Sequence, residues 1–451
     1  MVFQNNVLSG AAGSGTTVYT IDQSIRFNPA DSAYMSRTPS GSSSSRKKWT
    51  FSGWFKRGNI TPSSSSRFFN VHSDSNNFFI SQFQSDDSFN VTAREGGSEV
   101  LKFEPARRFR DPSAWYHVVM AFDSTNSIGS ERFRVYFNGV RDTTALETTP
   151  SADLELVVLE NCLHQIGRDT YSGSTFLFDG YMADLVLLDG TSTDCSSFGE
   201  FNSSGIWIPK SVSGLTFGTN GFYIDGRDSS DLGDDESGQG NDFTTSGLAA
   251  HDQMADSPTN NHATWSPITG SAQVYSNGNL NAATASSAWK GGFTTIQVPL
   301  NSGTWYYEMY IDSAGSSSGQ LSIGWSESDR SVTDNNDSGD TQGWVTYALI
   351  GKTYNNAAST VSYGATYTTG DVIGCKIDTD TSSNNITFYK NGASQGNLSE
   401  AFNGGTTGFI SPYILLYGTR NATARFAQAE WTQTPSGITE DNAINTKNLG
   451  S

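Results

Sequence analysis

The chain has 451 residues and a formal net charge of −18, and its 35% hydrophobic content is sufficient for two or three domains. Residues 1–210 carry 18 basic and 22 acidic side chains, a net −4, whereas residues 211–451 carry 9 and 23, a net −14. This acidity argues against nucleic acid or an anionic membrane as a partner. No apolar run approaches the roughly 20 residues that a membrane-spanning helix needs, so we expect no membrane insertion.

Residues 1–20 form the first segment, which is small, polar and rich in glycine. Its apolar anchors are Val2, Phe3, Val7 and Leu8. Two interpretations stay open: a frayed terminus, or an arm that becomes ordered when those anchors dock on a partner.

Residues 21–225 show short apolar stretches separated by Ser, Asn, Asp and Gly, the pattern of strands between turns. WTFSGWFKRG (49–58) alternates apolar and polar positions around Gly53, and WYHVVMAFD (115–123) is strongly apolar. We therefore predict an antiparallel two-sheet sandwich over 21–225.

Residues 226–262 lose all periodicity while charge, Gly and Pro rise, which predicts an acidic linker between domains. The acidic run around it could bind calcium, which prefers several oxygen ligands, although a solvated linker is the alternative that we favour. We expect no other cofactor or metal. The run consists of Asp225, Asp228, Asp231, Asp234, Asp235 and Glu236.

Residues 263–431 return to strand patterns, as in GTWYYEMYID (303–312) and GDVIGCKID (370–378), and predict a second sandwich. Residues 432–451 are polar and are expected to form a loose tail.

The two predicted sandwiches share one hairpin sequence. RVYFNGV (134–140) and ITFYKNG (386–392) both carry a tyrosine two residues before an Asn-Gly pair. Asn-Gly suits a type I′ turn, in which both central residues have positive φ. Two domains of one architecture would explain the repeat, but convergent use of a favourable turn is the alternative.

Segments within 24–190 resemble, in order, a laminin-G-like domain of the concanavalin A-like lectin superfamily. The segments are SIRFNPADSAYMSRTP, WTFSGWFKRG, WYHVVMAFD, RVYFNGV and FDGYMADLVLLDG. Residues 263–430 resemble a SPRY domain through WYYEMYI, IGW, GDVIGCKID, ITFYKNG and SPYILLYG. Both resemblances imply antiparallel β-sandwiches of jelly-roll type, so the predicted fold class is all-β with two concanavalin A-like domains in tandem.

The whole arrangement also resembles virion proteins of marine bacteriophages. The carriers are FQNNVLSGAAG, IDQSIRFN and DSSDLGDDESGQGNDFTTSG followed by DQMADSPTNNHAT. This resemblance implies localisation in a virion, other virion proteins as partners, and a fibre or adhesin role. Fibres are often trimeric, so a homotrimer is possible, although no heptad repeat indicates one.

Catalytic patterns are scarce. The five histidines are dispersed, and His117, inside an apolar strand, is expected to be a satisfied sandwich residue rather than a metal ligand. Asp153 and Glu155 lie on one face of a possible strand, but two solvent-facing acids are the favoured interpretation over a glycosidase pair. We therefore predict that the chain is not an enzyme.

Loop aromatics are the candidate ligand contacts, because a flat ring stacks on the apolar face of a sugar. They are Trp207, Trp289, Trp344 and Tyr347. The leading hypothesis is a virion fibre or adhesin whose lectin-like sandwiches bind a glycan or protein on the host surface. A purely structural decoration or connector is the second hypothesis, and a glycan-degrading enzyme is the third.

Overall fold

The computed structural model describes residues 19–171, 174–268, 273–315, 321–327, 344–355, 361–380, 384–400, 402 and 408–449. The described residues divide into two compact units, 19–260 and 261–449. The candidate arm residues Val2, Phe3, Val7 and Leu8 lie outside them. Among the described residues, no helix is long and apolar enough to cross a membrane.

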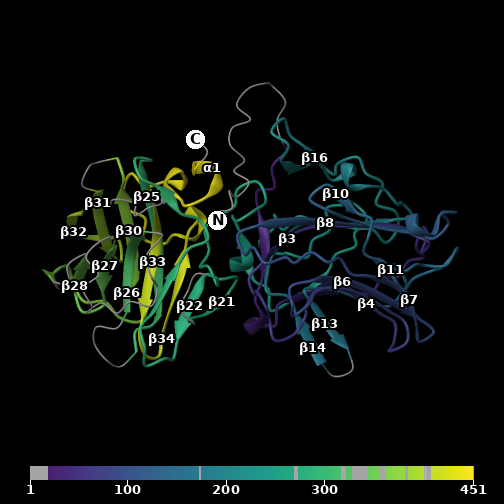
Figure 1. The fold of residues 1–451 in the computed structure, drawn as a ribbon, viewed down its shortest axis with the longest axis horizontal. Coiled ribbons are helices and arrows are strands. Elements are labelled where there is room, and N and C mark those ends of the chain that lie inside the picture. The colour runs from purple at the N-terminus through teal and green to yellow at the C-terminus, as the bar shows by residue number, and fades with distance from the viewer. Residues whose placement is uncertain are drawn as a thin grey trace. The chain divides into compact units, whose positions relative to one another are not determined.

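The first unit contains two large antiparallel sheets, here called sheet A and sheet B (Figure 1). Sheet A runs in the order β10 (Val140–Asp142), β9 (Phe133–Phe137), β8 (Trp115–Asp123), β3 (Lys48–Arg57), β15 (Gly180–Asp189), β1 (Ser24–Phe27) and β20 (Gln253–Met254), with β18 (Phe222–Ile224) paired to β15. Sheet B runs in the order β11 (Leu146–Thr148), β7 (Ser98–Phe103), β6 (Phe89–Glu95), β5 (Phe78–Phe83), β4 (Ser66–His72), β12 (Leu163–Ile166), β2 (Tyr34–Arg37) and β19 (Thr244–Ser246).

The core of the first unit lies between these sheets. Phe51 of sheet A stacks on Phe69 of sheet B with ring centroids 4.5 Å apart. Successive side chains of a strand point to opposite faces, so alternate apolar positions line this interior. Apolar residues on the other face of sheet A, among them Val119 and Val186, form a second buried cluster with Phe198 and Phe217. β3 continues through Gly53. Glycine is needed at this position because the Leu185 side chain occupies the space that a Cβ would take.

Two small hairpins complete the first unit. β13 (Arg168–Tyr171) and β14 (Ser174–Leu177) pack against β4 and project from the outer side of sheet B (Figure 1). β16 (Gly199–Phe201) and β17 (Trp207–Pro209) pair with each other near the Asn-Gly turn that follows β9.

The second unit is also built from two antiparallel sheets, here called sheet C and sheet D. Sheet C runs in the order β21 (Val274–Ser276), β22 (Asn281–Thr284), β34 (Arg420–Arg425), β25 (Thr304–Ser313), β30 (Val372–Asp378), β31 (Asn384–Lys390) and β32 (Ala393–Glu400). Sheet D runs in the order β23 (Lys290–Phe293), β33 (Phe409–Leu416), β26 (Leu321–Glu327), β27 (Trp344–Ala348), β28 (Lys352–Asn355) and β29 (Val361–Ser362), with β24 (Val298–Pro299) paired to β33. Tyr307 of sheet C packs on Trp325 of sheet D, so the aromatic core again lies between sheets. The predicted all-β class is confirmed.

Helical structure is confined to short turns in the described residues. They are the 3-10 turns η1 (Pro29–Asp31), η2 (Gly129–Glu131), η3 (Cys195–Ser197), η4 (Ala250–Asp252), η5 (Gln428–Glu430) and η6 (Glu440–Asn442), and the α-helix α1 (Thr446–Leu449).

Both units use the repeated hairpin in the same way. Asn138 and Gly139 have φ of 47° and 79°, and Asn391 and Gly392 have φ of 47° and 80°, which confirms the predicted positive-φ turn. In each unit the asparagine side chain accepts a hydrogen bond from a backbone N–H of the neighbouring strand, at 2.7 Å for Asn138 and 2.8 Å for Asn391.

The segment predicted to be an acidic linker is instead part of the first unit as far as Asn260. It contributes β19 and β20, and Phe243 packs edge-on against Phe222 at 4.9 Å. Buried ion pairs fasten it further: Arg26 pairs with Asp252 at 3.0 Å and Lys56 with Asp256 at 2.6 Å. A few buried anchors are sufficient because its aspartates satisfy backbone N–H groups in the intervening turns.

The C-terminal segment expected to be loose is docked on the second unit. Glu308, fully buried in β25, accepts hydrogen bonds from the backbone N–H groups of Thr432 at 2.8 Å and Gln433 at 2.9 Å. Ile438 and Ile444 are buried, so the apolar minority of this polar sequence decides its position.

Candidate functional site

The outer side of sheet B carries a row of polar side chains at one level of neighbouring strands. In register, Arg67 of β4 lies opposite Gln82 of β5, and Gln82 lies opposite Asn90 of β6. The next inward-facing positions, Phe83 and Phe89, are fully buried in the core. Alternation along each strand therefore places the polar set outside while the phenylalanines hold the strands in place.

These side chains form one hydrogen-bonded ladder across the sheet. Arg67 Nε donates to Gln82 Oε1 at 3.0 Å, and Gln82 Nε2 donates to Asn90 Oδ1 at 3.2 Å. Asn90 Nδ2 donates to Glu104 Oε2 at 3.4 Å, and Lys102 Nζ lies 3.4 Å from the same oxygen. We call Arg67, Gln82, Asn90, Lys102 and Glu104 the polar face.

The β13–β14 hairpin borders the polar face through Asp169. This fully buried carboxylate contacts the guanidinium of Arg67, and its Oδ1 lies 2.8 Å from His72 Nε2. Burial alone would raise the pKa of Asp169, but His72 and then Arg67 outweigh it and hold that pKa below its ordinary value. The aspartate is therefore a fixed negative charge that orients the first rung of the ladder.

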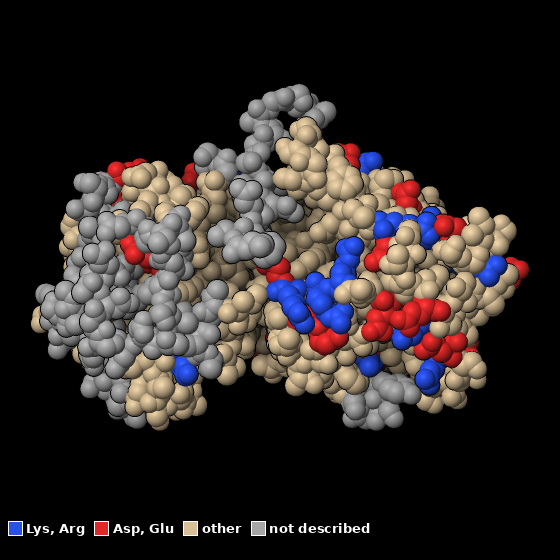
Figure 2. Space-filling model, viewed as in Figure 1, with Lys and Arg blue, Asp and Glu red and all other residues tan. Residues whose placement is uncertain are grey.

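At the opposite end, Lys102 also contacts Glu147 of β11 at 2.7 Å. The hydrogen bond with Glu147, ahead of the charge of Glu104, raises the pKa of Lys102. Charges of both signs therefore alternate along the ladder, and on the visible side of the first unit Lys and Arg likewise lie among Asp and Glu (Figure 2). Amides, carboxylates and cations in one row offer both hydrogen-bond donors and acceptors.

The predicted aromatic contacts are divided between the two units, with Trp207 in the first and the other three in the second. Trp207 is half-buried, and its Nε1 donates to His117 Nδ1 at 3.0 Å while its ring covers Gly139. Tyr347 is fully buried in the second unit, which contradicts its expected place on a loop surface. Its ring packs against Tyr367 and Phe388, so it belongs to the core.

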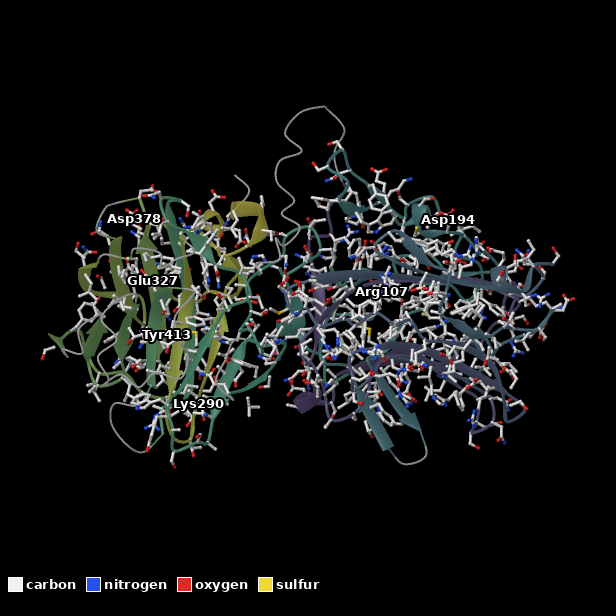
Figure 3. The ribbon with its side chains drawn as sticks, viewed as in Figure 1. Arg107, Asp194, Lys290, Glu327, Asp378 and Tyr413 are labelled. Atoms are coloured by element: carbon white, nitrogen blue, oxygen red, sulfur yellow. The ribbon has the colours of Figure 1, made fainter. Side chains whose placement is uncertain are left out.

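The other two candidates differ in what the structure shows. Trp289 is half-buried and packs on Tyr417 at 5.4 Å, next to the cluster that contains Tyr413 (Figure 3). Trp344 begins β27, but its side chain lies outside the described residues. Ligand contact by Trp207 and Trp289 stays a prediction.

His117 is a satisfied core residue, as expected. Its Nδ1 accepts the hydrogen bond from Trp207, so the ring proton lies on Nε2, 2.9 Å from Ser52 Oγ. Burial lowers the pKa of His117 to about 3, and the imidazole is neutral at physiological pH.

Each of the two candidate acids is engaged by a nearby cation. Asp153 and Glu155 contact separate cations, Lys47 at 3.2 Å and Arg46 at 3.7 Å, and both carboxylates are more than half exposed. The residues around them do not form the expected strand.

The acidic run organises turns. Asp235 accepts hydrogen bonds from the backbone N–H groups of Tyr223 and Asn241, each at 2.8 Å. Within the described ranges, no group of three or more His, Cys, Asp or Glu side chains is arranged to hold a metal ion.

Comparisons with known proteins define the class. The model of the concanavalin A-like lectin/glucanases superfamily matches residues 30–195, and the SPRY domain model matches residues 304–429. The chain thus carries a lectin-like concanavalin A-like domain followed by a SPRY domain, which confirms both resemblances and supports a binding role. No curated protein matches the chain.

Solved structures match parts of the chain at low identity. The SPRY domain of human HERC1 is 20% identical over 36% of this chain and 96% of its own, with a TM-score of 0.30. A putative carbohydrate binding protein from Bacteroides ovatus is 14% identical over 50% of this chain and 58% of its own, with a TM-score of 0.36. A SAP-like pentraxin from Limulus polyphemus is 18% identical over 39% of this chain and 80% of its own, with a TM-score of 0.27.

Sequence reasoning missed the polar face. RFFNVHS, NNFFISQFQ and FNVTARE supplied its strands, and their polar alternate positions were the available signal. The contact between Arg67 and Asp169, 102 residues away, depends on the placement of the β13–β14 hairpin, which no local sequence pattern predicts.

Proposed function

We propose that this protein binds a glycan on the polar face of its first unit. The observation that carries the proposal is the ladder from Arg67 through Gln82 and Asn90 to Glu104, which holds donors and acceptors in fixed positions on the outer side of a sheet. The match of residues 30–195 to a lectin-like family supports the same ligand class.

The setting that we propose is a bacteriophage virion, in which the protein serves as a fibre or adhesin and meets glycans of the host surface. The resemblance of FQNNVLSGAAG and of the segments around 225–264 to phage virion proteins supports this setting. Removal of residues 1–20 should abolish incorporation into particles, and unchanged incorporation would contradict a docking role for the arm.

Glycan binding is tested with the full chain on a host-derived glycan array. Gln82→Ala removes the central rung while Phe83 and the core stay intact. Arg67 and Asn90 then lose the partner that positions them, so we expect a loss of affinity of about tenfold, or about 1.4 kcal/mol. Gln239→Ala changes an exposed glutamine of the same unit and should leave binding unchanged.

Two outcomes of this experiment would contradict the proposal. One is an array on which the wild-type chain binds nothing, which would favour the alternative of a structural connector. The other is binding that Gln82→Ala leaves at wild-type strength, which would place the glycan elsewhere.

A further inference from the structure

Two arginines on the outer side of sheet B lie over aromatic rings and lack an acidic partner. The Arg94 guanidinium lies 5.7 Å from the centre of the Phe78 ring, and that of Arg168 lies 4.2 Å from the centre of the Tyr34 ring. Within the described part of the chain, neither arginine forms an ion pair, and Arg168 Nε is buried without a hydrogen-bond partner.

Nearby acids are occupied by other groups. Glu99, opposite Arg94 in the register of β6 and β7, accepts a hydrogen bond from Thr148 Oγ1 at 2.8 Å. Asp169, next to Arg168 in the chain, is directed to Arg67 and His72. Among the described residues, therefore, neither guanidinium group has a carboxylate in direct contact.

Stacking prepares such a group for a carboxylate ligand. An aromatic ring covers one face of the planar guanidinium and restricts its rotation, while the N–H groups at its edge stay in the plane. That edge matches a carboxylate in a bidentate, charge-assisted pair.

The two arginines lie far apart on sheet B. Arg94 belongs to β6 and the ring under Arg168 belongs to β2, with β5, β4 and β12 between these strands. Four spacings of about 4.8 Å separate the two strands by about 19 Å, which is further than one sugar residue reaches.

We propose that the ligand of the polar face is an acidic glycan, a uronic-acid polymer, with one carboxylate on Arg94 and another on Arg168. The inference rests on the proposed glycan binding and adds the chemical class. The net negative charge of the chain does not prevent binding of an acidic glycan. Most of the excess negative charge lies in residues 211–451, and charges beyond about 8 Å are largely screened at physiological salt.

The test compares the full chain on alginate, polygalacturonate and glucuronate-containing oligosaccharides, each beside its carboxyl-reduced neutral counterpart. At least one acidic member should bind tenfold or more tightly than its neutral counterpart. Arg94→Gln and Arg168→Gln should each weaken that binding at least fivefold and reduce its salt dependence.

Arg107→Gln is the matched control. Arg107 is exposed, as Arg94 is, and also lies over an aromatic ring, 4.9 Å from the centre of Phe137, but it belongs to the loop between β7 and β8 (Figure 3). Arg107→Gln should not change the affinity for the acidic glycan.

Three results would overturn the inference. Equal affinity for acidic and carboxyl-reduced glycans would refute it while leaving glycan binding intact. An equal loss in Arg107→Gln would show attraction by overall charge rather than a site. No binding to any acidic member would also refute it, and the Gln82→Ala comparison on the array would then decide separately on glycan binding.

Discussion

Asp184 is a buried acid in a backbone conformation that few residues adopt. It lies at the irregularity of β15 between Ala183 and Val186, with φ of 45°, and is 6% exposed. Tyr19 and Tyr223 each donate a hydrogen bond to its carboxylate at 3.0 Å. Burial nevertheless raises the pKa of Asp184 to about 6. An acid that prefers its neutral form here makes the first unit less stable as pH rises.

Asp184→Asn should therefore stabilise the protein at alkaline pH. Because the folded pKa lies above the unfolded 3.8, the contribution of Asp184 is most favourable below pH 3.8 and is lost as pH rises through about 6. At pH 8 the raised pKa of Asp184 lowers the free energy of unfolding by about 3 kcal/mol. Asparagine cannot ionise and tolerates the positive φ of this position. Urea unfolding at pH 5 and pH 8 should show a gain about twice as large at pH 8 as at pH 5. Asp228→Asn, at an exposed turn, should show none, and a gain independent of pH would contradict this account.

At the scale of elements, buried polar contacts add to apolar packing in fastening short segments to the sheets. In the C-terminal segment, Glu308 accepts one backbone N–H at each of its two oxygens. The β16–β17 hairpin depends on Trp207, which covers Gly139 and Gly199 and donates to His117.

Glu308→Gln should release the C-terminal segment. An amide offers one acceptor oxygen and turns an N–H group toward the second backbone donor, which should cost about 2–4 kcal/mol. Limited proteolysis should then cleave beyond residue 431 faster than in the wild type. Asp441→Asn, an exposed change in the same segment, serves as control, and wild-type protection in Glu308→Gln would refute the clamp.

Trp207→Phe should loosen the β16–β17 hairpin while retaining most of the aromatic volume. Removing the indole N–H leaves His117 Nδ1 as a buried acceptor without its partner, at a cost of about 1–3 kcal/mol. Hydrogen exchange of the hairpin amides should accelerate. Exchange at the wild-type rate would show that ring packing alone holds the hairpin.

At the scale of the whole molecule, each unit has an aromatic core of its own. Phe69 is fully buried in the first unit and Phe388 in the second. We therefore expect two calorimetric transitions. Phe69→Ala should lower the free energy of unfolding of the first unit, and Phe388→Ala that of the second, by about 3–5 kcal/mol each. A single transition moved by both substitutions would show that the units unfold together.

Much of this architecture was predictable from the sequence. WYHVVMAFD coincides with β8, and both Asn-Gly turns form, because alternation and turn chemistry are local properties. The segment 226–260 and the C-terminal segment were misjudged, because a few apolar anchors such as Phe243 and Ile438 outweigh a polar composition once they are buried. The polar face could not be located, because its members meet only through sheet order and the placement of a hairpin.

Asn90, inside the ladder, is followed by Val91 and Thr92 and so forms an acceptor sequence for N-linked oligosaccharide. Its amide is only 4% exposed and its oxygen accepts from both Gln82 and Thr92. Production through a eukaryotic secretory pathway would offer this amide to the glycosylating enzyme before folding conceals it. An attached chain would then lie on the surface that we propose for the ligand, so bacterial expression is the sounder source of material for binding studies.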